Sequence, residues 1–365
     1  MTSFTPTEDQ QLLIETIRRY AINDVRPVAH EHDESSSPPL DVVETGWQIG
    51  LVASAIPEEL GGFGEMSAIT GVLAAEELAY GDLPVALHVM APALFAYPVI
   101  LFGTAEQRES LLPMFLEESL PPVSAALLEP GISFDAHAMQ ITASAADDGV
   151  TLNGVKAYVP LADSAEKLLV YARSADSDAV EAYIVPADTP GVSVEQREAL
   201  MGLRALPMFR VKFDDVRVPA EARLGGVVGI NYQTIADRMN VALAGLAVGV
   251  ARASFEYARD YAKERVQFGR PVAQNQSIAF MLGEMAIEID AARLMAWEAA
   301  WKIDQGQAAT REAYLARQHA NQMVLTVTDG GVQTLGGYGF IREYPAERWL
   351  RNGRGFPTFD GLAIV

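Results

Sequence analysis

Residues 333–340 read Gln-Thr-Leu-Gly-Gly-Tyr-Gly-Phe, and residues 264–269 read Glu-Arg-Val-Gln-Phe-Gly. The paired Gly336 and Gly337 permit a positive φ and let another molecule come close to the backbone. The planar guanidinium of Arg265 suits two phosphate oxygens. Taken alone, the glycines are more typical of a helix C-cap and the arginine of a surface charge. The meaning of both stretches therefore depends on the rest of the chain.

Composition excludes several classes of protein. The chain has 365 residues, 50% of them apolar, which is enough for a sizeable core in one large unit or in two to three domains. A net charge of −21, with 27 Lys and Arg residues, argues against nucleic acid or an anionic membrane as a partner. The lack of Cys removes disulfides, thiolate metal sites and a Cys nucleophile, and it fits a reducing cytoplasm.

The sequence carries no targeting or metal-binding pattern. Met1–Phe4 has neither a basic region nor an apolar run, so no signal peptide is predicted. The longest apolar run, Val241–Ala251, is well short of the roughly 20 residues that a membrane span needs, and it predicts a buried helix. His30 and His32 are too close together for a metal site, and no phosphate-binding loop of the Gly-Lys type occurs.

Hydrophobic periodicity predicts an α+β protein with a helical block on each side of a β block. Short apolar runs alternate with turn signals in the middle of the chain, and Asn153-Gly154 predicts a hairpin. The predicted domains are an all-α domain at 1–119, a β domain at 120–225 and a helical bundle at 226–365. Helices are predicted at 7–30, 40–54, 66–80, 84–102, 104–118, 229–265, 274–304 and 309–335.

Six ordered segments of this chain resemble the acyl-CoA dehydrogenase family over nearly its whole length. Each segment alone is a weak signal, but their joint order is strong support for the fold. The segments are Ile56–Gly62, Glu129–Gly131, Asn153–Lys156, Asp215–Pro219, Arg265–Gly269 and Gln333–Arg351.

This resemblance implies a helical domain, a β-barrel-like domain and a four-helix domain, assembled as dimers that pair into tetramers. It also implies FAD at the dimer interface, with the isoalloxazine ring on the β domain of one subunit and the pyrophosphate and adenosine held partly by the other. In that family a carboxylate removes the α-proton of an acyl-CoA, a hydride passes to the flavin, and electrons go on to an electron-transfer flavoprotein.

One half of the family's cofactor pattern is intact in this sequence. Arg265 matches the arginine that meets the pyrophosphate of the partner's FAD. Phe268 matches a residue at the same edge, and Gln276 matches a polar flavin contact. The remaining matches lie at the turn that meets adenosine and pyrophosphate, and they are Gln333, Gly336 and Gly337.

The other half, which would hold the flavin ring, is altered. Where the family usually has a Thr that bonds the pyrimidine edge, this chain has Leu128, and Phe134 replaces a Ser beside Ser133. Tyr158 could still cover the ring. Pro160 offers neither the hydroxyl nor the N–H that flavin N5 normally requires, and each unpaired ring heteroatom costs about 1–3 kcal/mol.

Asp360 occupies the position of the family's catalytic Glu and is the expected base, as in the related nitroalkane oxidases. Its carboxylate is shorter by one C–C bond, but Asp is a competent base if the backbone compensates. Phe134, Met239 and Phe359 are expected to crowd the substrate. Some members carry the base instead at a position that matches Met239 or its neighbour Asn240, and neither residue is a base. Asp237 matches a position near the CoA moiety, although a helix N-cap is the plainer interpretation.

Three hypotheses remain open from the sequence. The first is a working FAD-dependent acyl-CoA dehydrogenase with Asp360 as base. The second is a non-catalytic subunit of an α₂β₂ complex that completes the FAD site of a catalytic partner. The third, a flavin-free scaffold or CoA-ester binding protein, gives no reason to keep Arg265 and Gln333.

Overall fold

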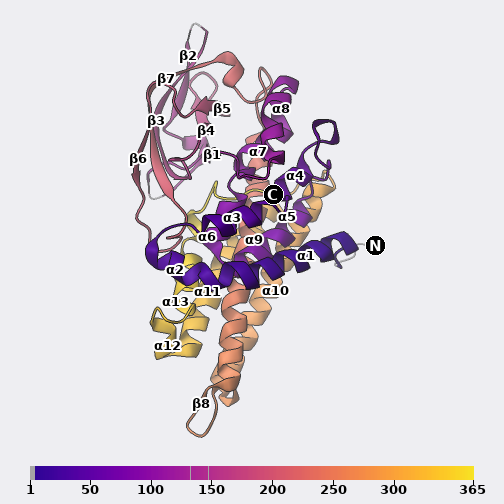
Figure 1. The fold of residues 1–365 in the computed structure, drawn as a ribbon, viewed down its shortest axis with the longest axis vertical. Helices are drawn as coiled ribbons and strands as arrows, with labels where there is room; N and C mark the ends of the chain where they lie inside the picture. Colours follow the sequence, from indigo (N-terminus) through magenta and orange to yellow (C-terminus); the bar gives the residue numbers. More distant parts are fainter. Residues whose placement is uncertain (1–4, 132, 147) are drawn as a thin grey trace.

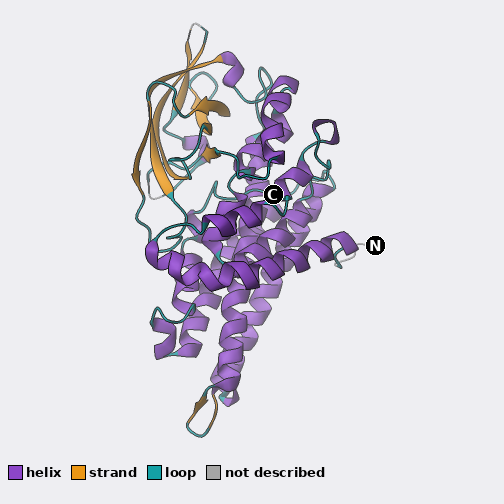
Figure 2. Cartoon of the chain, viewed as in Figure 1, coloured by secondary structure: helices purple, strands orange, loops and turns teal. Residues whose placement is uncertain are grey.

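The computed structural model describes residues 5–131, 133–146 and 148–365, so the predictions for Met1–Phe4 lie outside it. Figure 1 shows a sheet domain at one end, long helices running to the other end, and the amino-terminal helices packed across the middle. Figure 2 shows the strands gathered in that sheet apart from one small hairpin at the far tip. The expected order of helical, β and helical domains is confirmed.

The amino-terminal block is helical, and several of its helices are shorter than predicted. The predicted helix at 40–54 is divided at Gly50, whose φ of 81° ends one helix and begins the next. The region predicted at 84–102 is likewise divided around Pro92. The helices are α1 Glu8–Tyr20, α2 Arg26–Ser35, α3 Leu40–Trp47, α4 Leu51–Ala55, α5 Ala68–Gly81, α6 Leu83–Met90, α7 Ala93–Phe102 and α8 Ala105–Leu111.

The middle block is one seven-stranded sheet in the order β1-β4-β2-β3-β7-β6, with β5 paired to β4. The longest pairing joins β3 and β7, which are antiparallel. The strands are β1 Val123–Ala126, β2 Thr142–Ala146, β3 Gly149–Pro160, β4 Lys167–Ser174, β5 Val180–Pro186, β6 Val192–Arg197 and β7 Met208–Pro219.

The hairpin predicted at Asn153-Gly154 is wrong. Both residues lie inside β3, where the pairing with β7 shifts register between Leu152 and Gly154. Gly154 has a φ of 147°, and a Cβ there would lie 2.8 Å from the Cα of Ile141. The glycine therefore permits a β-bulge and a close backbone approach rather than a turn.

The carboxyl-terminal block consists of long helices close to those predicted. The predicted buried segment Val241–Ala251 is confirmed, since it lies in α9 with its side chains inside the core. The elements are α9 Tyr232–Glu264, the hairpin of β8 Val266–Gln267 and β9 Arg270–Pro271, α10 Gln276–Asp304, α11 Thr310–Leu335, α12 Gly337–Phe340 and α13 Ala346–Arg354.

Two described helical stretches, Leu83–Phe102 and Tyr232–Glu264, have the length and hydropathy of a membrane span. In both, 83% of the most apolar window is buried inside the fold. That burial is typical of core helices. Within Leu83–Phe102, α6 packs between the amino-terminal and carboxyl-terminal blocks and α7 packs against the sheet, and most of the buried residues of α9 lie between the two helical blocks.

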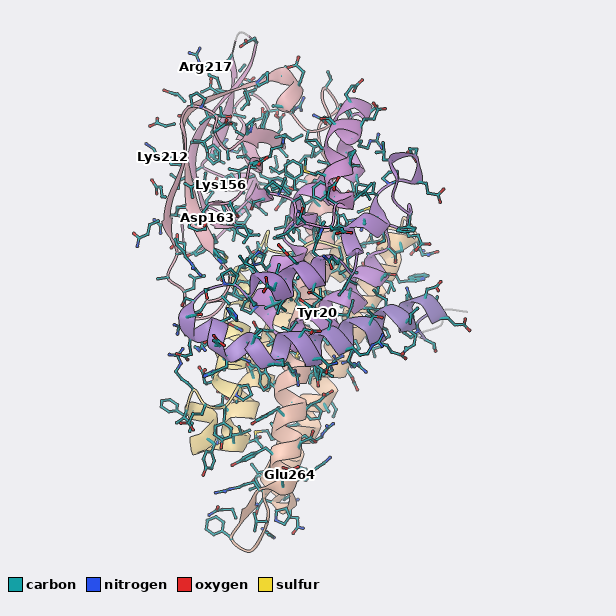
Figure 3. The ribbon with its side chains drawn as sticks, in the orientation of Figure 1. Tyr20, Lys156, Asp163, Lys212, Arg217 and Glu264 are labelled. Carbon is teal, nitrogen blue, oxygen red and sulfur yellow. The ribbon has the colours of Figure 1, made fainter. Side chains whose placement is uncertain are left out.

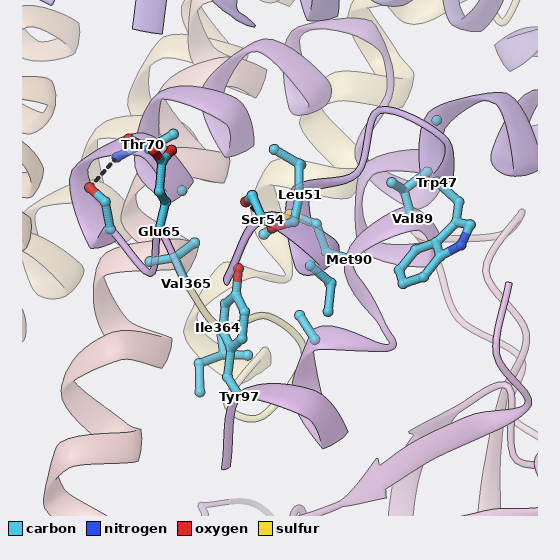
Figure 4. Close-up of a pocket in the computed structure, with 15 residues that line it drawn as sticks. Trp47, Leu51, Ser54, Glu65, Thr70, Val89, Met90, Tyr97, Ile364 and Val365 are labelled. Carbon is cyan, nitrogen blue, oxygen red and sulfur yellow. Dashed lines mark hydrogen bonds between the residues drawn. The ribbon is translucent and has the colours of Figure 1, made fainter. Parts of the chain in front are cut away.

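The last residues of the chain are also part of the core. Gly361–Val365 is buried between α9 and the amino-terminal helices, and the guanidinium of Arg238 donates to the Val365 carbonyl oxygen at 2.7 Å. Figure 4 shows Ile364 and Val365 beside Met90 and Tyr97. The space left there is about 30 Å³, which is room for about one water molecule.

Candidate active site

Asp360 opens into a cavity of about 250 Å³ between the sheet and the segment that follows α13. We call this the Asp360 cavity. Most of its wall comes from the loop after β1, the loop between β6 and β7, and the turn that leads to Asp360, and β3, β7 and α13 supply the rest. Its lining includes Leu128, Glu129, Gly131, Ser133, Phe134, Tyr158, Leu200–Leu203, Met208, Arg351, Arg354, Gly355, Pro357–Asp360 and Leu362.

Asp360 is half-buried at the end of a short 3₁₀ turn, Phe356–Thr358. The rings of Phe356 and Phe359 are 5.2 Å apart and form an apolar wall beside the carboxylate. Tyr232, the first residue of α9, lies near Asp360. Burial raises the pKa of the Tyr232 phenol well above its usual range, and the charges of Asp360 and Asp135 raise it further. The phenol therefore stays protonated and can donate a hydrogen bond.

The loop that faces Asp360 is anchored by a buried ion pair. The Lys156 ammonium lies 3.2 Å from Glu129 Oε1 and donates to the Leu127 carbonyl oxygen at 2.7 Å. The Glu129 carboxylate also accepts from the backbone N–H groups of Gln140 and Ile141. Burial lowers the pKa of Lys156 to about 8, and Glu129 opposes that change. These contacts hold Leu128 and Glu129 at the cavity wall.

Tyr158 and Pro160 have different places in this wall. Tyr158 lines the cavity and has a φ of 53°, a strained conformation for a residue with a Cβ. Pro160 is buried and does not line the cavity in the described part of the chain. Its carbonyl oxygen accepts from the Ser124 hydroxyl. Two residues that depart from the family's flavin-ring pattern are therefore placed differently: Leu128 lines the cavity, whereas Pro160 lies in the core behind its wall.

A second cavity, of about 440 Å³, lies where α9 and α11 end. We call it the Arg265 cavity, and Arg265, Gln333, Gly336 and Gly337 all line it. Gly336 has a φ of 60°, and no described heavy atom lies within 4 Å of a Cβ built on it. The Arg265 guanidinium lies 5.3 Å from the Tyr338 ring centroid. An exposed cation beside glycine backbone that no side chain covers suits an anionic group such as a diphosphate.

The two cavities lie at opposite ends of α9. Tyr232 at its start lies near Asp360, and Tyr261 in its last turn lines the Arg265 cavity. The 33 residues of α9 span roughly 50 Å at about 1.5 Å per residue. Figure 3 shows this separation, with Lys156 in the sheet domain and Glu264 near the far tip. A single dinucleotide is too short to reach both cavities of one chain.

Two residues predicted beside the intact half lie outside the Arg265 cavity in this single chain. Phe268 is 93% exposed at the tip of the β8–β9 hairpin, with a φ of 54°. Gln276 is exposed at the first turn of α10. Both side chains are free to meet another molecule.

Two predicted substrate residues lie in the core rather than in the Asp360 cavity. Met239 is buried between α9 and the sheet domain. Asp237 accepts from Gln233 and from the Thr310 hydroxyl, each at 2.7 Å, and so links α9 to the start of α11. The interpretation of Asp237 as a helix N-cap is wrong, because Asn231 caps α9.

Sequence reasoning missed three residues around Asp360. Tyr232 and Arg317 come from other helices, and no local motif marks them. Arg354 lines the cavity and is exposed, with no hydrogen bond or ion pair to another described residue. Only packing of distant segments brings these groups together.

Comparison with known proteins agrees with this architecture. Family models match in order: the acyl-CoA dehydrogenase N-terminal domain at 7–119, the middle domain at 124–216 and the C-terminal domain at 231–363. The chain is 33% identical to the mitochondrial short-chain specific acyl-CoA dehydrogenase of Bos taurus, over 98% of this chain and 88% of that protein.

Solved structures give the same result. Butyryl-CoA dehydrogenase from Megasphaera elsdenii superposes with a TM-score of 0.89 at 31% identity, over 97% of this chain and 95% of that one. The FAD complex of PigA superposes with a TM-score of 0.90 at 25% identity, over 98% and 95%. From its three domains in order and its likeness to these proteins over nearly its full length, the chain belongs to the acyl-CoA dehydrogenase family.

Proposed function

We propose that the chain is an FAD-dependent oxidoreductase of fatty acid or lipid metabolism that introduces an α,β double bond into an acyl-CoA thioester. The observation that carries this proposal is the Asp360 carboxylate, which opens into a cavity beside the Glu129 loop and Tyr158. The proposed reaction needs a base beside apolar surface that can contact an acyl chain, and the Asp360 cavity contains both. The lack of Cys supports a cytoplasmic location.

Asp360 would act as the general base on the α-proton of the thioester. FAD, when bound, supplies the acceptor for the hydride that leaves the β-carbon. Phe359, Phe134 and Leu362 line the cavity with apolar surface, which excludes water from the reacting carbons. Since Gly361–Val365 fills the core beyond Asp360, the acyl chain has little space to extend in that direction.

The Arg265 cavity fits the diphosphate and adenosine end of FAD through its guanidinium and the open backbone at Gly336 and Gly337. The flavin ring would lie in the Asp360 cavity beside Tyr158. The length of α9 separates these two sites within one chain, so a complete FAD site would need two chains. The exposed Phe268 and Gln276 would then contact the partner's cofactor.

An apolar face on α10 supports such an assembly. Phe280, Ile287 and Leu294 are spaced seven residues apart and are all exposed in the single chain. A stripe of this kind on one helix is typical of a helix–helix interface. We propose a tetramer built as a dimer of dimers, from one or two kinds of chain, that passes its electrons to an electron-transfer flavoprotein.

The decisive experiment measures bound flavin and turnover of the purified chain. The wild type should show visible flavin absorbance that bleaches with a short acyl-CoA. Asp360→Asn should keep the flavin and lose turnover by about 10²–10⁴-fold, the usual contribution of a general base. Full activity in Asp360→Asn would eliminate Asp360 as the base.

The interface assignment has its own control within the β8–β9 hairpin. Arg265→Ala should lower flavin affinity by about tenfold or more, because a charge-assisted diphosphate contact is lost. Arg270 bonds Asn275 and does not line the Arg265 cavity in the described structure. Arg270→Ala should therefore leave flavin content unchanged. Equal flavin loss in both variants would contradict the assignment.

A second candidate function rests on the apolar Leu128 in the wall of the Asp360 cavity and on the buried Pro160 carbonyl. Neither offers a donor to a flavin ring, which favours a non-catalytic subunit that lends its Arg265 cavity to a different partner chain. Such a chain would be colourless alone and would bind flavin only with its partner. A chain that stays colourless in both conditions would instead be a flavin-free scaffold or CoA-ester binding protein.

A further inference from the structure

Arg317 on α11 is a buried cation with few partners. Its side chain is only 2% exposed. Nη2 donates to the Phe356 carbonyl oxygen, while Nη1 is buried without a hydrogen-bond partner in the described part of the chain. No described carboxylate lies at ion-pairing distance from it. A guanidinium buried in this way is costly unless a negative charge lies close enough to compensate.

The carbonyl group that accepts from Arg317 belongs to the 3₁₀ turn Phe356–Thr358, which precedes Asp360. The Phe356 carbonyl oxygen also accepts from the Phe359 N–H at 3.2 Å, which closes the 3₁₀ turn. The guanidinium lies 6.0 Å from the Phe356 ring centroid, and that ring packs on Phe359. Arg317 is thus fixed to the back of the wall that presents the Asp360 carboxylate.

The electrostatics of Arg317 also connect it to Asp360. Burial lowers the pKa of Arg317 to about 10, and the carboxylate of Asp360 opposes this change. Arg317 therefore keeps its proton at neutral pH. Asp360 is in turn the negative charge that acts on it from within the same wall.

The other charged or titratable groups that face Asp360 are differently placed. Arg351 on α13 is already paired with Asp33 and Glu347, and Arg354 is exposed to solvent, where its charge is screened. Tyr232 on α9 keeps its proton, and the Asp135 carboxylate on the loop after β1 acts on Tyr232. Glu129 and Tyr158 also line the cavity, and Glu129 is paired with Lys156. Arg317 is the buried positive charge of this group that lacks a carboxylate partner of its own.

We propose that Arg317 is a positioning residue for Asp360, which fixes the turn through the Phe356 carbonyl oxygen and holds a positive charge behind the cavity wall that carries the Asp360 carboxylate. This inference rests on the proposed function in taking Asp360 as the base. It adds a residue from a distant helix to the machinery of proton removal.

The test reads the Asp360 carboxyl directly, without substrate. Protein labelled with [4-¹³C]aspartate is titrated by infrared difference spectroscopy, and the signal missing from Asp360→Asn identifies Asp360. Arg317→Gln removes the charge but keeps a donor for Phe356, and it should raise the Asp360 pKa by about one pH unit. Arg317→Lys keeps the charge and should leave that pKa near the wild-type value.

Arg238→Gln is the matched control. Arg238 is also buried, also donates to one backbone carbonyl and also has an unpartnered nitrogen, but the carboxylate that acts on it is Asp304. It should lose stability without changing the Asp360 pKa. A shift in Arg317→Gln no larger than that in Arg238→Gln, or an equal shift in Arg317→Lys, would overturn the proposal.

Kinetics provide a second readout in the same variants. The acid limb of kcat/KM should move upward with the infrared pKa in Arg317→Gln and stay in place in Arg317→Lys. If Asp360→Asn were fully active while the infrared shift remained, the proposed base would be wrong and the coupling between the two residues would still hold. An acid limb that stays in place in Arg317→Gln, in an enzyme that does depend on Asp360, would contradict the catalytic part of the inference.

Discussion

The Lys156 ammonium lies 3.2 Å from Glu129 Oε1, deep inside the sheet domain. This contact joins the loop after β1 to the middle of β3, and both ends belong to motifs that the sequence shows as separate segments. Glu129 also holds two backbone N–H groups, those of Gln140 and Ile141. The pair is therefore the structural support of one wall of the Asp360 cavity.

Removal of the Lys156 charge should destabilise the fold strongly. Lys156→Met leaves the Glu129 carboxylate buried without its cation, which costs about 3–5 kcal/mol. Urea unfolding measures this loss. The control is Lys212→Met, since Lys212 forms an exposed pair with Asp214, and such pairs contribute at most about 1 kcal/mol. Similar unfolding midpoints for the two variants would show that the buried Lys156 pair contributes no more to stability than the exposed Lys212 pair.

The bulge in β3 makes a second prediction. Gly154→Ala would place a Cβ 2.8 Å from the Cα of Ile141 on a backbone with a φ of 147°. The crowding and strain should lower the free energy of unfolding by about 2 kcal/mol or more. A Cβ added at Gly283 in α10 would have no described heavy atom within 4 Å, so Gly283→Ala should instead raise stability by about 0.5–1 kcal/mol. Thermal unfolding of the two variants should therefore shift in opposite directions.

His88 predicts how stability changes with pH. Burial lowers its pKa to about 4 from an ordinary value of 6.5, and its Nδ1 has no partner in the described chain. Between these values the unfolded chain binds a proton that the folded chain does not. The His88 contribution is therefore present above pH 6.5 and is lost as pH falls, by about 1.4 kcal/mol per pH unit.

His88→Leu tests this contribution. The free energy of unfolding of the wild type should fall more steeply than that of the variant as pH drops from 6.5 toward 4. The exposed His30 provides the control, because His30→Leu should keep the wild-type slope. Parallel pH profiles for the wild type and His88→Leu would refute the assignment.

The helical periodicity of the sequence predicted most of the fold. The three long segments predicted at 229–265, 274–304 and 309–335 agree with α9, α10 and α11 within a few residues. The apolar residues of these helices recur with helical spacing over many turns, so the pattern identifies each helix from its own sequence. Two of the errors fall at glycines, since Gly50 divides a predicted helix and Gly154 forms a bulge rather than a turn, and another falls at Pro92, which divides a second predicted helix. A glycine in the sequence indicates that an unusual backbone conformation is allowed, but it does not distinguish a helix break, a turn and a β-bulge.

The family resemblance also grouped residues from distant segments that line the same cavity in the structure. It paired Arg265 with the turn at Gly336 and Gly337, and it placed Tyr158 with the loop at Leu128 and with Asp360. It could not exclude Asp237 and Met239 from the substrate site, because their burial depends on α11 and on the sheet.

The order of motifs along the chain determined the family and the domain order, and it identified Asp360 as the residue that matches the family's base. Tertiary structure decided which groups surround Asp360. Arg317 and Tyr232 reach Asp360 from helices far away in the chain, and the length of α9 holds the two cavities apart. A sequence motif reflects residues that are close together along the chain. The electrostatic environment of a carboxylate depends on every charged group that packing brings near it, including groups from distant segments.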